Sequence, residues 1–135
     1  MRLVSLKADL ISIDVRSKMS IQFFLEESTG VAIPWCSTDA LGPDDVDILA
    51  CLLIDDGGGP FVETIPWLDE GLNRLIAVRR EDEVSTEWAR DAWATHISKS
   101  GVKIYSLYDE DFSITISLDD FERALRGWKD FLLSL

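Results

Sequence analysis

The chain has 135 residues, which suits one domain (1–135), and 47% of them are hydrophobic, so a full core can form without disulfides or metals. Its formal net charge is −12, from 25 acidic and 13 basic residues. A charge of this sign is repelled by nucleic acids and anionic membranes and attracted to basic partners, although it can also serve solubility alone. We therefore expect no nucleic-acid partner and no membrane partner.

The cysteines and the start of the chain favour a cytoplasmic protein. Cys36 and Cys51 lack a redox or metal-binding spacing, and two cysteines are too few for a disulfide framework, so we interpret them as reduced core thiols. Residues 1–9 carry a charge every few positions and do not resemble a signal peptide. No apolar run approaches the roughly 18 residues of a membrane span.

Alternating apolar and polar residues predict strands in the first third of the chain, at residues 2–6, Leu10–Val15 and Met19–Leu25. Glu26–Gly30 is predicted to be a turn. Val31–Trp35 is predicted to be extended, and its proline argues against a central position in a sheet. Together these segments predict an antiparallel meander.

The middle of the chain carries mixed helix and strand patterns. Pro43 suits the first turn of a helix, and Asp44, Asp45 and Asp47 follow it near the positive end of the helix dipole. Ile48–Ile54 is almost wholly apolar and fits either this helix or a buried strand. Three further predictions cover the next segments: a short strand at Phe61–Ile65, a helix at Pro66–Arg80 and a second helix at Ser85–Ala92.

The last third predicts three strands and an amphipathic helix. Strands at Trp93–Ile97, Val102–Leu107 and Phe112–Ser117 are expected, with the acidic turn Asp109-Glu110-Asp111 between the last two. Ser117 then suits a helix N-cap. The helix has one apolar stripe, formed by Phe121, Ala124, Leu125, Trp128, Phe131, Leu132 and Leu135. The fold class predicted is α+β: an antiparallel sheet with helices packed on it, ending in a strand–turn–strand–amphipathic helix unit.

The chain shows no pattern of catalytic, cofactor-binding or metal-binding residues that stands out. The single histidine, His96, has no partners at metal-ligand spacing and is interpreted as a surface or core-edge residue. The segment Asp55-Asp56-Gly57-Gly58-Gly59 lacks the lysine of a phosphate loop and the spacing of a calcium loop, and therefore predicts a turn that ends a helix. We expect no cofactor, no metal and no enzymatic activity.

Acidic clusters are the candidate partner-binding residues, on charge alone. They are Asp44, Asp45 and Asp47, then Asp55 and Asp56, then Asp109, Glu110 and Asp111. A metal site where the first two clusters meet in space is a minor alternative, because the first cluster already suits a helix start. The five tryptophans are predicted to lie in the core, with one or two of Trp35, Trp67, Trp88 and Trp93 as possible interface anchors.

Three segments in residues 101–135 carry a family resemblance: Val102–Glu110, Ile116–Phe121 and Trp128–Leu132. This part of the chain resembles immunity proteins of bacterial polymorphic-toxin systems, above all those of contact-dependent growth inhibition. The resemblance implies a cytoplasmic protein without catalytic residues that binds the C-terminal domain of its cognate toxin, often a basic nuclease, and blocks the active site.

Two other hypotheses stay open at this point. One is a non-catalytic acidic adaptor or nucleic-acid mimic, which a toxin gene directly upstream would argue against. The other is an enzyme with a carboxylate site, which a deep pocket holding carboxylates of raised pKa would favour.

Overall fold

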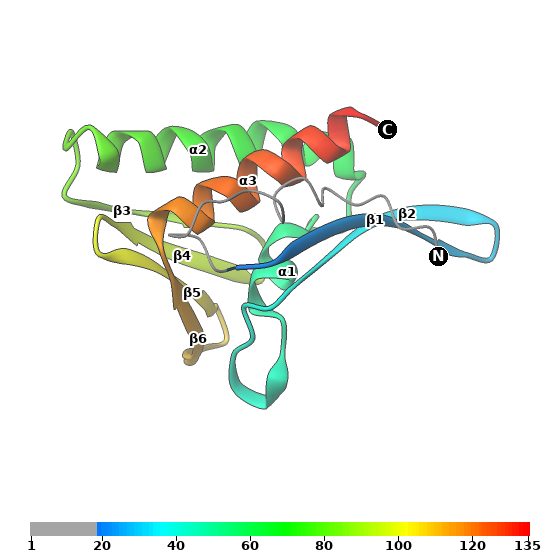
Figure 1. Cartoon of the computed structure of the whole chain (residues 1–135), viewed down its shortest axis with the longest axis horizontal. Coiled ribbons are helices and arrows are strands. Elements are labelled where there is room, and N and C mark those ends of the chain that lie inside the picture. The colour runs from blue at the N-terminus through cyan, green and yellow to red at the C-terminus, as the bar shows by residue number, and fades with distance from the viewer. Residues whose placement is uncertain (1–18) are drawn as a thin grey trace.

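The computed structural model describes residues 19–135 and shows an α+β arrangement (Figure 1). The elements in chain order are β1 (Ile21–Ser28), β2 (Val31–Thr38), the 3-10 turn η2 (Pro43–Asp45), α1 (Ile48–Leu53), the 3-10 turn η3 (Phe61–Thr64), α2 (Ile65–Arg79), β3 (Ser85–Ala89), β4 (Trp93–Ser98), β5 (Gly101–Ser106), β6 (Asp109–Ile116) and α3 (Leu118–Leu133). The strands predicted at residues 2–6 and Leu10–Val15 lie outside the described residues.

Two antiparallel sheets form the β layer. One is the β1–β2 hairpin, and the other has four strands in the order β3-β4-β5-β6. Helices α2 and α3 lie side by side over one face of the larger sheet, and the hairpin projects to one side (Figure 1). Trp88, Ile97 and Ile104 are buried on the helix-covered face. The paired residues Glu87, His96 and Lys103 alternate with them and therefore lie on the opposite face.

Helix α3 matches its predicted sequence pattern closely. The Ser117 side chain caps it by accepting a hydrogen bond from the backbone N–H of Asp120 at 3.0 Å. The predicted stripe is buried from Phe121 to Leu132. Leu135 is the exception, because the helix ends at Leu133 and leaves it 58% exposed.

An aromatic cluster around Trp128 joins α3 to the hairpin. The Trp128 ring is fully buried, and its centroid lies 5.8 Å from that of Phe23 in β1, 6.0 Å from that of Phe61 in η3 and 5.9 Å from that of Phe131. The contact between Phe23 and Trp128 joins residues more than 100 positions apart in the chain through side-chain packing.

Several predicted boundaries in the first half need correction. Strand β1 continues through Glu26–Ser28, and the turn is only Thr29-Gly30, where both residues have positive φ. The proline in β2 does lie in an edge strand, as predicted, because the sheet has two strands. No helix begins at Pro43, since Asp44 and Asp45 have positive φ angles that a right-handed helix cannot contain.

The open question at Ile48–Ile54 is resolved as a helix. Asp47 caps α1, whose six residues begin at Ile48. Leu49, Leu52 and Leu53 are fully buried, so the helix is apolar because the core surrounds it.

Two predictions of element type are wrong. Phe61–Thr64 forms a 3-10 turn that leads directly into α2, so the strand predicted there does not exist. Ser85–Ala89 is a strand, not the start of a helix, because it pairs with β4 and alternates, with Trp88 inside and Glu87 outside. The helix predicted at Pro66–Arg80 is confirmed as α2, with Leu68, Leu72 and Leu75 buried.

We expect Gly71→Ala to lower the free energy of unfolding by about 1–2 kcal/mol, even though alanine favours helix. The reason is that a Cβ at Gly71 in α2 would lie 2.9 Å from Cε2 of the buried Trp88 indole. Urea denaturation measures the change. Asn73→Ala, at an exposed position of the same helix, is the control and should not destabilise the protein. Equal stability of the two variants would mean that Trp88 can move aside.

Candidate protein-binding face

The acidic triplet Asp109-Glu110-Asp111 begins strand β6 and is not the predicted turn. The turn is Leu107-Tyr108, and the pairing shifts by a bulge at Tyr105 and Ser106. All three acidic residues are exposed, and no ion pair joins them to a cation within residues 19–135. Asp109 Oδ1 accepts a hydrogen bond from the Asp111 N–H at 3.0 Å. The carboxylates are therefore available to an incoming partner.

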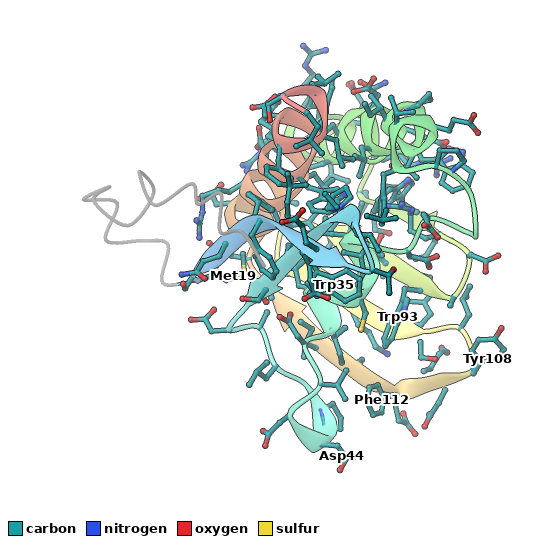
Figure 2. All side chains as sticks on the ribbon, turned by 90° about the vertical axis from the view of Figure 1, so that its right-hand side faces the viewer. Met19, Trp35, Asp44, Trp93, Tyr108 and Phe112 are labelled. Atoms are coloured by element: carbon teal, nitrogen blue, oxygen red, sulfur yellow. The ribbon has the colours of Figure 1, made fainter. Side chains whose placement is uncertain are left out.

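Asp44 and Asp45 form a second exposed acidic site at the tip of a loop. Both residues are in η2, are exposed and make no ion pair with another described residue. This loop and the β5–β6 end lie on the side of the molecule away from α2 and α3, and Figure 2 shows Asp44 at the lower end (Figures 1 and 2). The two free acidic sites therefore share one side of the molecule.

The other three acids predicted to bind a partner, Asp47, Asp55 and Asp56, make hydrogen bonds within the fold. The Asp47 carboxylate accepts hydrogen bonds from the Thr38 N–H and the Thr38 hydroxyl, both at 2.6 Å, and from the Ala50 N–H at 3.1 Å. Asp55 Oδ2 accepts from the Ala92 N–H at 2.8 Å, and Asp56 Oδ1 accepts from the Gly58 N–H at 2.8 Å. These carboxylates satisfy buried or turn N–H groups, so charge alone was a poor guide to their role.

The acidic clusters do not meet to form a metal site. Across residues 19–135, no group of three histidine, cysteine, aspartate or glutamate side chains is arranged to hold a metal ion.

Partly exposed aromatic residues accompany the free acids. The Trp93 and Phe112 rings contact one another with centroids 6.3 Å apart, and both are half-buried. Figure 2 shows them between Trp35 of the hairpin above and Asp44 below. We call the following set the acidic–aromatic face: Asp44, Asp45, Trp93, Asp109, Glu110, Asp111 and Phe112.

The β1–β2 hairpin adds an exposed apolar stripe. Val31, Ile33 and Trp35 alternate along β2 and are 57%, 36% and 37% exposed. Trp35 and, at 44% exposed, Trp67 therefore lie partly at the surface, as the prediction allowed for one or two of the tryptophans, whereas Trp88 and Trp128 are buried. The sequence signal for an exposed stripe is the alternation of apolar residues in a strand that already has a buried partner face.

A further polar cluster lies on the open face of the larger sheet. Glu87 contacts His96 Nδ1, and its Oε1 accepts a hydrogen bond from the Tyr105 hydroxyl at 3.1 Å. Burial and then the hydrogen bond to Glu87 raise the pKa of Tyr105, so its hydroxyl stays protonated at neutral pH. His96 is exposed, as the sequence predicted.

The two cysteines are free thiols. Cys36 is buried and Cys51 is half-buried. Burial is the main cause that raises the pKa of each thiol, so both remain protonated and weakly nucleophilic at neutral pH.

Comparison with protein-family models, with curated proteins and with solved structures finds no match in any of the three. No helix within the described part of the chain is long and apolar enough to cross a membrane.

We expect Asp47→Ala to lower the free energy of unfolding by about 1–3 kcal/mol, because the α1 cap and both contacts with Thr38 are lost together. Thermal or urea denaturation measures the loss. Asp45→Asn is the matched control, since its carboxylate is exposed and asparagine tolerates positive φ. If the two variants were equally stable, the hydrogen bonds of Asp47 would not contribute to stability.

Proposed function

We propose that this protein is an immunity protein, which binds the C-terminal domain of a cognate toxin in the cytoplasm and occludes its active site. The observation that carries the proposal is the acidic–aromatic face. Its exposed carboxylates lack a cationic partner within residues 19–135 and accompany a half-buried aromatic pair. The resemblance of residues 101–135 to immunity proteins supports the same function.

The charge of the chain suits a basic nuclease as the toxin. A nuclease needs cationic side chains to hold a phosphate backbone, and these give its cleft a positive potential. A protein with a net charge of −12 is steered toward such a cleft and can fill it with carboxylates. No catalytic group of the inhibitor is required for this mechanism.

The acidic–aromatic face has the composition of a tight interface, which an acidic surface without aromatic residues would lack. Stable interfaces combine a small number of aromatic anchors with a polar rim, and the anchors contribute most of the binding energy. Trp93 and Phe112 provide the anchors here, and Asp44, Asp45 and the β6 acids provide the rim. The rim charges should act mainly on the rate of association.

The first test is co-purification of the full chain with the C-terminal domain encoded by the neighbouring gene, together with a growth-rescue assay. We expect a one-to-one complex and restored growth. A complex with a basic protein that is not toxic would support the adaptor hypothesis and contradict immunity. No complex and no rescue would contradict both.

A charge-reversal variant tests the acidic–aromatic face itself. We expect Asp109→Lys, Glu110→Lys and Asp111→Lys together to weaken toxin binding by about tenfold or more and to flatten its salt dependence. The loss should appear mainly as slower association in surface plasmon resonance at several salt concentrations.

The matched control reverses three exposed acids outside the face: Glu63→Lys, Asp82→Lys and Asp130→Lys. It changes the net charge by the same amount, so equal losses in the two variants would show that only overall charge matters. Unchanged affinity and salt dependence in the first variant would exclude β6 from the interface.

A further inference from the structure

A buried arginine occupies the β3–β4 turn, and two of its three guanidinium nitrogens have no hydrogen-bond partner in the described part of the chain. Arg90 is only 7% exposed, and its guanidinium carbon lies 5.6 Å from the ring centroids of both Trp67 and Trp88. Nη2 donates to the Asp55 carbonyl, whereas Nε and Nη1 have no hydrogen-bond partner in the described part of the chain. A buried donor without a partner is destabilising and rare in folded proteins, so this arrangement points to a missing acceptor.

A cavity beside Arg90 offers a place for that acceptor. It has a volume of about 270 Å³ and is lined by Trp67, Glu70, Trp88, Ala89, Arg90 and Asp91. Drug-sized ligands occupy about 300–1,000 Å³, so this cavity suits a smaller molecule. Its walls combine one guanidinium, two carboxylates and two indole side chains.

The charges around the cavity exclude a simple anion site. Burial lowers the pKa of Arg90 to about 10, with Asp55 and Asp56 acting in the opposite direction, and the guanidinium remains charged at neutral pH. The nearby carboxylates of Asp55, Asp56 and Asp91 outnumber this one cation and would repel a phosphate dianion. A ligand that pairs with both the Arg90 donors and a carboxylate of the cavity wall must therefore carry a carboxylate and a positive group together.

Asp91 is the carboxylate available to such a positive group. Glu70 already pairs with Arg74, with 2.7 Å between Oε2 and Nη2. Asp91 is exposed and makes no ion pair with another residue in 19–135.

We propose that the cavity binds a free α-amino acid as a zwitterion. Its carboxylate would accept hydrogen bonds from the unused Arg90 donors, its ammonium group would face Asp91, and an apolar side chain would lie against Trp67. The Arg90 donors are shielded from solvent, so the ligand must displace one aromatic wall. Trp67 is that wall, because it is 44% exposed whereas Trp88 is 4% exposed.

The test is calorimetric titration of the full chain with each of the twenty L-amino acids, with acetate, methylammonium and inorganic phosphate as partial ligands. We expect saturable binding of at least one apolar amino acid at millimolar concentration or below. Each partial ligand should bind at least about tenfold more weakly, because it satisfies only one end of the site. Binding should also change tryptophan fluorescence as Trp67 moves.

Two variants locate the site without altering the buried arginine. We expect Asp91→Asn to weaken binding by about tenfold or more, because the ammonium group loses its carboxylate. We expect Trp67→Ala to abolish the preference for apolar amino acids over glycine, because the surface against which the ligand side chain lies is removed. Trp35→Ala and Asp82→Asn are the matched controls, because they remove a comparably exposed indole and an exposed carboxylate elsewhere, and they should leave binding unchanged.

Three results would overturn the proposal: no amino acid binds, acetate binds as tightly as the best amino acid, or both site variants bind like the unaltered chain. The titration uses no toxin, so it is decided independently of the immunity function.

Discussion

Burial of Trp128 is the constraint on which the arrangement of the molecule depends. The β1–β2 hairpin and the four-stranded sheet share no strand pairing within residues 19–135, so side-chain packing must fix the position of one sheet relative to the other. Trp128 provides this packing, since it contacts Phe23 from the hairpin and Phe61 from η3 while α3 rests on the larger sheet. The direction in which the hairpin presents its exposed stripe is therefore set by a residue close to the C-terminus.

The sequence predicted the elements whose local pattern and tertiary environment agree. Helix α3 has one apolar stripe, a capping serine and one buried side, so periodicity alone located it. Ser85–Ala89 shows the opposite case, because Ser85-Thr86-Glu87 resembles a helix start while pairing with β4 makes it a strand. Such pairing is a long-range contact, and no local pattern contains it.

The candidate site was predictable in composition but not in geometry. Adjacent acids looked equivalent in the sequence, yet Asp47 binds three donors while Asp44 and Asp45, three and two residues away, bind none in the described part of the chain. The difference arises because the loop brings Asp47 back to Thr38, which a charge count cannot reveal. Arg90 was missed for a related reason, since it lay inside a predicted helix and carried no motif.

The β3–β4 turn links the two surfaces that we propose. Asp55 holds this turn twice, through its carboxylate on the Ala92 N–H and through its carbonyl on the Arg90 guanidinium. The Arg90 N–H in turn donates to the Trp93 carbonyl at 2.7 Å, and Trp93 belongs to the acidic–aromatic face. A change at Asp55 would therefore disturb the amino-acid cavity and the protein-binding face together. Substitutions at Trp67 and Asp91 would alter the cavity without changing a residue of the acidic–aromatic face, because both residues line the cavity and neither belongs to that face.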